Sequence, residues 1–438
     1  MALELAPSGN GAKLGGAVVL GLAVAAAGAV ALRRWPWLLA FATLACVPGR
    51  IPVTIGSEEA NLLLPLYLVV ASLALALGWE LLHGDGRARE LGPAALPLAG
   101  LVAWTGLSLL WSDDVRQGAI FLLAFVLPFG VLAIGFARLP WRQRAFGWLY
   151  AALAATALVF AGIGVFQWVT RDVFWNQKVE VGNAYAPFYR VNSVFWDPSI
   201  YGRYLVTAIL ATLVLVLLGL GGRRLAGAIV LVAATWVGLL FSFSQSSFVA
   251  LVAGVLVGAA IVWRRHALLA FALVGIVLVV AGFSTAQVRH TLLEKSRSSL
   301  NKATSGRAGL VSNGLRIAVD HPVAGVGVGS FKRAYAERTG LRGRNPKKAA
   351  SHSTPVTVAA ETGFPGLLLL LWFVGATLVA ALRRSAATPA GRASLAVGLT
   401  LGAIAVHSLF YNAFFEDPMA WALTGLVAVV AARRSEEA

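Results

Sequence analysis

Runs of 18 or more predominantly apolar residues recur along almost the whole chain, from Leu14 to Ala432. Each run is long enough to cross ~30 Å of hydrocarbon as a helix, and a helix satisfies its own backbone hydrogen bonds there. Of the 438 residues, 13% are charged, whereas a soluble domain carries roughly 25%. The sequence therefore predicts an all-α, polytopic membrane protein that forms a single transmembrane domain over residues 1–438.

The number of spans depends on one weak segment, which is short and contains Pro36 and Pro48. If this segment crosses the membrane, the chain has 13 spans and an external N-terminus; otherwise it has 12 spans and both ends lie inside. The smaller count would place Arg33 and Arg34 outside, against the charge rule for short loops, so we favour 13. The expected spans lie near residues 14–32, 35–48, 61–79, 93–111, 118–137, 145–169, 198–220, 225–242, 246–263, 267–286, 364–382, 393–413 and 418–432.

Orientation follows from the charges of the short loops. Arginines fall on alternate connections: Arg33 and Arg34, Arg87 and Arg89, Arg138, Arg142 and Arg144, Arg223 and Arg224, Arg264 and Arg265, Arg383, Arg384 and Arg392, and Arg433 and Arg434. The intervening loops carry acids or no charge: Glu58 and Glu59, Asp113 and Asp114, Glu416 and Asp417. Short loops rich in Lys and Arg mark the cytoplasmic side, so the acidic loops are expected outside.

One long loop, residues 287–360, separates the spans expected at 267–286 and 364–382. It holds 13 Lys and Arg against three acidic residues, a net charge of +10 out of +17 for the chain. The parity of the span count places this loop outside, where it gains nothing from the anionic inner leaflet. We therefore expect a large, basic, helical extracytoplasmic loop that carries catalytic elements.

Two segments of this loop suggest local structure. "TSGRAGLVSNGLRIAVDHP" has a capped start and an apolar face, which favour a helix with Arg307 in its first turn. A cation there opposes the helix dipole, so Arg307 is either a solvated side chain or one half of an anion site. "HPVAGVGVGSF" contains Gly325, Gly327 and Gly329, but it lacks the G-x-G-x-x-G spacing of a nucleotide loop. A tight turn between two interfacial helices fits it better.

His352 lies at the edge of the next apolar span, in "SHSTPVTVAAETGFPG". Ser353, Thr354 and Pro355 predict the start of a helix, so the histidine could simply cap or solvate that start. A neutral imidazole is also a ready general base near neutral pH. The segment "FYRVNSVFWDPSIYGRYL" adds Arg190 before a span and Arg203 inside it, where an arginine either is functional or snorkels to the interface. Asp197 is a possible partner of Arg203.

Several motifs occur in an order that resembles the bacterial O-antigen ligase/polymerase superfamily. His352, the Glu361-Thr-Gly363 triplet and Gly366 resemble its histidine-to-Glu-x-Gly signature. The stretch "SGRAGLVSNGLRIAVDHPVAGVGVGSF" is similar to the family's main external loop, "RVNSVFWDPSIYG" to its arginine-containing entry, and "FSQSSFVAL" to a later serine-rich helix start. The order and spacing agree over about residues 185–420.

The resemblance implies a metal-independent membrane glycosyltransferase of the GT-C type that uses no cofactor. Such enzymes transfer a glycan from undecaprenyl diphosphate to a hydroxyl outside the cytoplasmic (inner) membrane, with inversion. By match, His352 is the catalytic base, Arg190 and Arg307 bind the diphosphate, and Glu361 and Gly363 support them. The family's common Ser-Arg is Ser244-Gln245 here, so Arg203 and Arg316 are candidate substitutes for that arginine. The expected partners are the carrier-linked donor, a glycan or lipid-linked acceptor and the bilayer, not nucleic acid.

Two other functions are compatible with parts of the sequence. A lipid-linked glycan transporter would place ionisable residues at mid-membrane, and the spans are nearly free of Asp, Glu and Lys. A metal-dependent glycosyltransferase could use the external pairs Glu58–Glu59 or Asp113–Asp114, whereas the single cysteine, Cys46, excludes a thiolate cage. The residues do not distinguish a ligase from a polymerase, nor do they identify the acceptor, the sugars or the oligomeric state.

Overall fold

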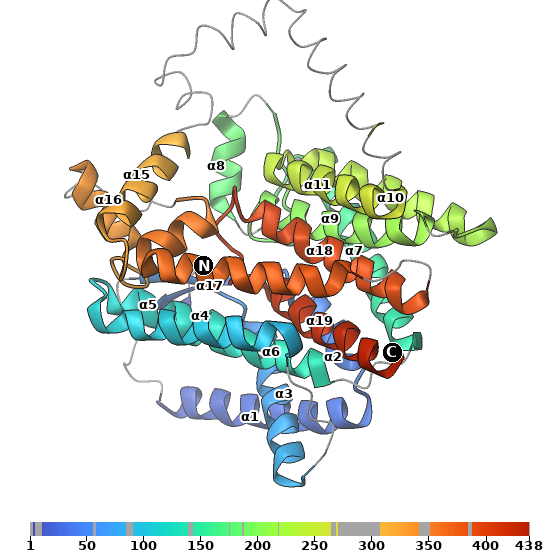
Figure 1. The fold of residues 1–438 in the computed structure, drawn as a ribbon, viewed down its shortest axis with the longest axis horizontal. Coiled ribbons are helices and arrows are strands. Elements are labelled where there is room, and N and C mark those ends of the chain that lie inside the picture. The colour runs from blue at the N-terminus through green and yellow to red at the C-terminus, as the bar shows by residue number, and fades with distance from the viewer. Residues whose placement is uncertain are drawn as a thin grey trace, which may run out of the picture.

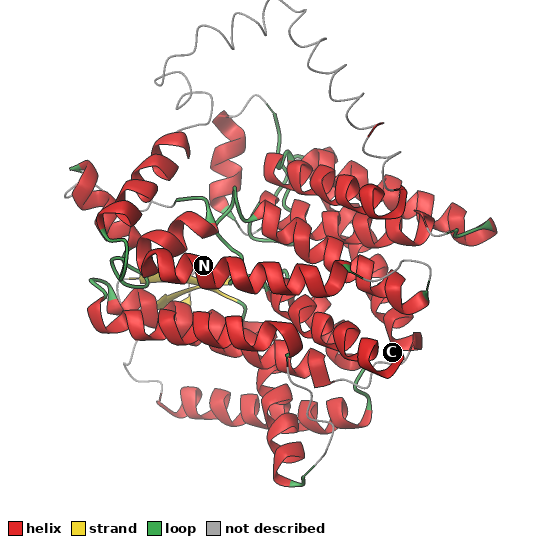
Figure 2. Ribbon diagram, in the orientation of Figure 1, coloured by secondary structure: helices red, strands yellow, loops and turns green. Residues whose placement is uncertain are grey.

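The computed structural model describes residues 3–4, 11–55, 58–84, 91–138, 143–174, 176–185, 188–217, 219–263, 269, 307–340, 351–383 and 388–437. Nearly all of this chain is helical, as Figure 2 shows. The helices are α1 (Gly11–Arg34), α2 (Leu38–Cys46), α3 (Leu64–Leu82), α4 (Ala95–Leu107), α5 (Val115–Phe121), α6 (Leu127–Arg138), α7 (Gln143–Thr170), α8 (Gln177–Tyr185), α9 (Pro198–Leu217), α10 (Gly222–Ser242), α11 (Gln245–Trp263), α15 (Arg307–Asp320), α16 (Phe331–Thr339), α17 (Thr354–Leu382), α18 (Pro389–His407) and α19 (Pro418–Glu437).

Short turns link some of them. The 3₁₀ turns η1 (Gly92–Ala94) and η2 (Ser108–Trp111) flank α4, and the π-helical turn η3 (Leu122–Val126) joins α5 to α6. A small sheet, which the sequence analysis did not anticipate, is formed by β1 (Leu3–Glu4), β2 (Ile51–Ile55) and β3 (Glu58–Leu62) in the order β1-β2-β3. The β-branched run "IPVTI" favours β2, because branched side chains fit a pleated surface.

Nine helical segments of the described chain are long and apolar enough to cross a membrane, which confirms an α-helical polytopic membrane protein. They are Leu64–Leu82, Gly92–Trp111, Val115–Arg138, Phe146–Thr170, Pro198–Val216, Gly222–Ser242, Gln245–Trp263, Thr354–Leu382 and Pro389–His407. Helix α1 covers the expected span 14–32, and the apolar part of α19, Pro418–Ala432, is shorter. The span expected at 267–286 lies outside the described residues, apart from residue 269.

The doubtful second span corresponds to α2, whose nine residues rise only ~14 Å. Helices α1 and α3 run side by side in the same direction, because Gly28 faces Ser72 and Arg33 lies 5.0 Å over the ring of Trp79. The chain must therefore return across the bundle between Arg34 and Leu64. Helix α2 forms part of that return. Its Leu39 and Leu44 are buried against the rest of the protein, so this helix does not have to be long enough to cross the lipid by itself.

The charged loops separate into two ends of the bundle. At one end, Arg138 and Glu80 are 3.7 Å apart, and both line a small pocket with Arg33. At the other end, Arg50 pairs with Glu416 at 3.1 Å, and α15 and α16 lie there, at the left in Figure 1. The C-terminal end of α19 lies at the opposite end of that view. This separation agrees with the predicted alternation, while the cytoplasmic identity of the Arg33 end stays a prediction.

We expect a cysteine at Ser312, on the exposed surface of α15, to react with a membrane-impermeant thiol reagent in intact cells, with Cys46 replaced by alanine. A cysteine at Gly221, at the opposite end of the bundle before α10, should react only after lysis. The reverse pattern of labelling would invert the topology.

Candidate functional site

A cavity of about 400 Å³ opens at the end of the bundle where α17 begins. It is bounded by α4, α5, the start of α17, the glycine-rich turn before α16 and the loop between α18 and α19. Its polar wall includes Gln117, Asp197, Lys332, His352, Glu361, Asn412 and Glu416, and its apolar wall includes Leu101, Phe121, Val358, Phe414 and Phe415. The volume lies in the range of small-ligand sites, roughly 300–1,000 Å³.

His352 enters this cavity from a constrained turn. Its φ of 54° is left-handed, a conformation that costs a non-glycine residue on the order of 1–3 kcal/mol. The Ser351 hydroxyl holds the turn: it lies 2.5 Å from the Thr357 hydroxyl, donates to the Ser353 carbonyl at 2.8 Å and accepts from the Ser353 N–H at 3.1 Å. Ser353, not His352, occupies the N-cap position of α17. The capping role considered for His352 is therefore wrong.

The surroundings of His352 favour its neutral form. Burial lowers the pKa of the imidazole below its usual value, the positive charge of Arg307 lowers it further, and Asp197 partly offsets both effects. The ring makes no hydrogen bond to another described residue. A neutral, unpartnered imidazole in a cavity is able to accept a proton from a ligand near neutral pH.

Arg190 is not part of the cavity lining, but it is electrostatically coupled to Asp197 and Tyr411, which are. Asn183 fixes its backbone through two 2.9 Å hydrogen bonds, accepting from the Arg190 N–H and donating to the Arg190 carbonyl. Its Nε donates to the Ser242 carbonyl at 3.0 Å. Burial lowers the pKa of Arg190, Asp197 raises it and the charge of Arg307 lowers it again. Arg307 and Asp197 thus act electrostatically on both Arg190 and His352.

The backbone is strained at the end of α10, next to the Ser242 carbonyl that accepts from Arg190. Phe243 has a φ of 47°, which is a genuine outlier for a bulky residue. Its ring stacks on Phe188 with the centroids 4.6 Å apart, and the Val191 N–H donates to the Phe241 carbonyl at 3.0 Å. The last residue of α10, just before the serine-rich motif, therefore contributes a carbonyl to Arg190, whereas the family pattern has an arginine within that motif.

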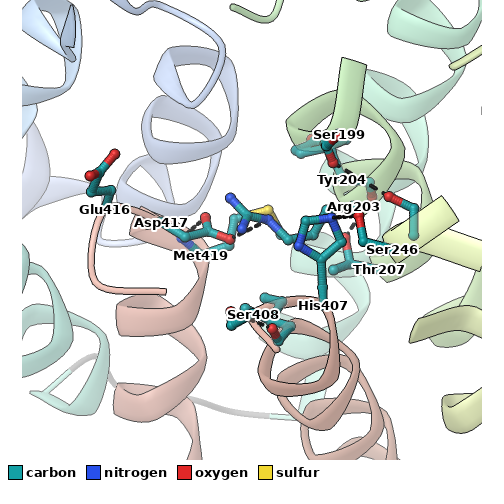
Figure 3. Close-up of polar contacts among 12 residues, drawn as sticks. Ser199, Arg203, Tyr204, Thr207, Ser246, His407, Ser408, Glu416, Asp417 and Met419 are labelled. Atoms are coloured by element: carbon teal, nitrogen blue, oxygen red, sulfur yellow. Dashed lines mark hydrogen bonds and ion pairs between the residues drawn. The ribbon is translucent and has the colours of Figure 1, made fainter. Parts of the chain in front are cut away.

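Arg203 lies elsewhere, and its expected pairing with Asp197 is wrong. Its Nε is 2.9 Å from Oδ2 of Asp417, and the two side chains are 4% and 5% exposed (Figure 3). Asp197 instead accepts from the Ser199 N–H at 2.6 Å, as the N-cap of α9. Buried His407 contacts the Ser246 hydroxyl at 3.0 Å beside the ion pair. Arg203 is thus part of a buried network between α9, α18 and α19.

Arg316 is also separate from the cavity. It is exposed on α15, nine residues after Arg307, which corresponds to ~13.5 Å along the helix axis. Like Arg190 and Arg307, it is not part of the cavity lining, but it is not among the charges that shift the pKa of His352 or of Arg190. Neither of the two suggested substitutes for the missing arginine is therefore coupled to His352 or Arg190.

Glu361 and Gly363 connect α17 to the glycine-rich turn. The Phe331 N–H donates to Oε1 of Glu361 at 3.1 Å, and the Gly327 N–H donates to the Glu361 carbonyl at 2.8 Å. Gly363 breaks α17 with φ 70° and ψ −174°, a region open only to glycine, and a Cβ there would collide with the Val323 carbonyl.

The turn itself has the predicted form. Gly325, Gly327 and Gly329 all have positive φ and connect α15 to α16. The Ser112 hydroxyl donates to the Val328 carbonyl at 2.8 Å and anchors the turn to the loop before α5. These contacts fix α15 and α16, and with them Arg307, relative to His352.

Of the two acidic pairs considered as metal ligands, the structure describes the side chains of Asp113 and Asp114, and this pair makes other contacts. Asp114 caps α5 by accepting from the Gln117 N–H at 3.1 Å, and the Asp113 carbonyl accepts from Arg333 at 2.7 Å. The side chains of Glu58 and Glu59 lie outside the described residues. Within the described ranges, no group of three or more His, Cys, Asp and Glu side chains could hold a metal ion.

Fold and site together define a multi-pass α-helical membrane protein with a half-buried histidine and two arginines at one end of the bundle. Residues 228–371 match the family model for O-antigen ligases. The match covers about a third of the chain and agrees with the resemblance to the O-antigen ligase/polymerase superfamily seen in the sequence. The matched region contains Arg307, His352, Glu361 and Gly363, whereas Arg190 precedes it. No curated protein matches the chain.

Replacing Asp417 with asparagine should lower stability by about 3–5 kcal/mol, because Arg203 would remain buried without its counter-charge. Asparagine can still cap α19 as Asp417 does, so the loss would report the charge. The matched control is Glu337→Gln, which removes an exposed pair with Arg333 and should change stability by about 0–1 kcal/mol. Thermal unfolding in detergent measures both, and equal melting temperatures would contradict the buried pair.

Proposed function

We propose that this chain transfers a glycan from undecaprenyl diphosphate to an acceptor hydroxyl at the outer face of the cytoplasmic membrane, as an O-antigen ligase or a polysaccharide polymerase. The observation that carries the proposal is that His352 and Asp197 line one cavity, while the charge of Arg307 acts on both His352 and Arg190. Incubation of the purified protein with a carrier-linked oligosaccharide and candidate acceptors, followed by mass analysis of the products, tests it.

The two arginines are suited to the leaving group. As the bond between C1 of the donor sugar and the diphosphate oxygen breaks, the electron pair stays on the diphosphate and its negative charge grows. Guanidinium groups stabilise that charge through bidentate hydrogen bonds and need no metal ion. Arg307 opens α15, so its backbone N–H groups and the helix dipole also favour an anion there.

His352 is suited to the acceptor. The acceptor oxygen forms a bond to C1 while its proton passes to the neutral imidazole, which becomes imidazolium. Attack opposite the diphosphate inverts the anomeric centre, as in other inverting enzymes whose base acts on the face away from the leaving group. A diphosphate is already a good leaving group, so the proposed reaction requires no general acid.

The position of the cavity is suited to a lipid-linked donor. It lies at the end of the bundle, with apolar side chains from α4 and α17 on one wall and charged groups on the other. A polyprenyl chain would remain in the bilayer beside the spans, and the diphosphate would lie at the level of Arg190 and Arg307. This arrangement explains why the site residues begin or precede spans instead of occupying their centres.

We expect Arg190→Ala and Arg307→Ala each to lose about 2–4 kcal/mol of transition-state stabilisation, by analogy with the removal of one oxyanion donor. Lysine should restore activity only partly, because it lacks the planar fork. The matched control is Arg316→Ala, which lies on the same helix as Arg307 but away from the cavity and should retain normal activity. Full activity in both alanine variants at positions 190 and 307 would refute the diphosphate site.

His352→Asn should fold, bind donor and turn over about 10²–10⁴-fold more slowly, because an amide accepts no proton at neutral pH. Asparagine also tolerates the left-handed backbone of this position. Turnover measured beside donor affinity checks this expectation. Near-normal turnover would show that the histidine is not the base.

The pH profile provides a separate test. The base must be deprotonated, so the rate should be constant at high pH and fall as the pH drops through the pKa of His352. Because burial and Arg307 lower that pKa, the midpoint should lie below ~6.5. Asp197→Asn should move the midpoint further down, since the carboxylate raises the pKa while asparagine preserves the cap of α9. In the residual activity of Arg307→Ala the midpoint should move up.

A further inference from the structure

The cavity has two chemically different ends. The electrostatic partners of Arg190 are Asp197, Arg307 and Tyr411, so one end is cationic and contains His352. Glu416 belongs to the other end. There it forms an ion pair with Arg50, and its negative charge acts on the side chains of Tyr67 and Tyr411. Tyr411 lies between the two ends. The diphosphate and base assigned above account for the first end only.

Three side chains of the cavity lining have hydrogen-bonding capacity that the described protein leaves unused. Asn412 and Glu416 lie on the same loop, and Gln117 lies one turn before Phe121, which packs against Phe415 beside Glu416. The side-chain amides of Gln117 and Asn412 line the cavity and make no hydrogen bond to another described residue. Glu416 accepts from Arg50 through Oε2 at 3.1 Å, and Arg50 also donates to the Glu416 carbonyl at 2.9 Å. Its Oε1 makes no such bond within the described chain. Unpaired polar groups in a partly buried cavity are costly unless a ligand or water completes them.

The loop that carries Asn412 and Glu416 is anchored at both ends. Asp417 is tied to Arg203, while the neighbouring Glu416 points the opposite way, as Figure 3 shows. The Ser408 carbonyl, at the start of the same loop, accepts from the Thr354 N–H at 2.9 Å, which couples the loop to the helix that follows His352. Asn412 and Glu416 are therefore held at a fixed distance from the base.

The chemistry of this end fits a sugar ring. Each side-chain amide offers both donors and an acceptor, and a carboxylate accepts from hydroxyl groups, which suits the vicinal hydroxyls of a pyranose. Phe121 and Phe415, packed edge to face with their centroids 5.9 Å apart, provide an apolar surface for the C–H face of such a ring. No such combination is needed for a polyprenyl chain or a diphosphate.

Given the proposed function, on which this inference rests, the reacting hydroxyl must lie across C1 from the diphosphate. We propose that Gln117, Asn412 and Glu416 form the subsite for the acceptor sugar, with His352 between this subsite and the arginines. The ligand class is a pyranose with free vicinal hydroxyls. Its source is either the carrier-linked repeat unit or a lipid-anchored surface oligosaccharide, and the acceptor used in the assay distinguishes them.

The test uses the full-length protein, a carrier-linked oligosaccharide as donor, and two acceptors in separate arms: the same oligosaccharide released from its carrier, and lipopolysaccharide that lacks O-antigen. The double variant Gln117→Ala/Asn412→Ala should fold normally, since neither side chain bonds within the described protein. Its KM for the acceptor used by the wild type should rise about tenfold or more, from the loss of two hydrogen bonds, with the KM for donor unchanged. The matched control is Gln177→Ala, an exposed glutamine on α8 that should leave both KM values unchanged.

The outcomes separate the two proposals. An unchanged acceptor KM in the double variant, or a rise confined to the donor KM, would overturn the subsite and leave the proposed function standing. Absence of transfer by the wild type to either acceptor would overturn the proposed function and the subsite with it. Transfer to one acceptor only, with its KM raised in the double variant, would support the subsite and identify the source of the sugar.

Discussion

The break in α17 at Gly363 is the constraint on which the site depends. Its backbone angles are open only to glycine, and the helix before the break can therefore leave the line of the membrane span. That first part carries Glu361, whose side chain and carbonyl accept N–H groups from the glycine-rich turn. The turn in turn fixes α15 and its first residue, Arg307. One glycine thus allows a single helix to join the span, His352 and, through the glycine-rich turn, Arg307.

The buried ion pair between Arg203 and Asp417 fixes another part of the site, the loop between α18 and α19. Desolvation makes such a pair a poor source of net stability, although the loss of one partner is severe. Its contribution is geometric: it fixes the start of α19 and therefore the loop that carries Tyr411, Asn412 and Glu416. Both Asp197 and Asp417 precede a proline and cap the helices that follow them, so these two acids set the direction in which their loops enter the bundle.

The sequence was sufficient for the fold class, because apolar length and loop charge are local properties. It also predicted the glycine-rich turn, whose three glycines adopt the expected positive φ. The pairing of Arg203 with Asp417 could not be predicted, since it joins residues more than 200 positions apart and Asp197 was the nearer acid. The Asp-Pro dipeptides were a usable signal for two helix starts. Gln117 and Asn412 carried no signal, because single amides in a helix or a loop are ordinary until the fold brings them to one cavity.

The arginines of the site affect the pKa of His352 in two ways, one before and one after the donor binds. In the free protein, Arg307 lowers the pKa of His352 and keeps the imidazole neutral, which is the form that a base requires. A bound diphosphate would bring negative charge to Arg307 and Arg190 and would cancel part of this effect. The pKa of His352 would then rise after the donor has bound, and the imidazole would become a stronger base when the acceptor arrives. In the proposed mechanism, donor binding and base strength are thus coupled through one electrostatic field.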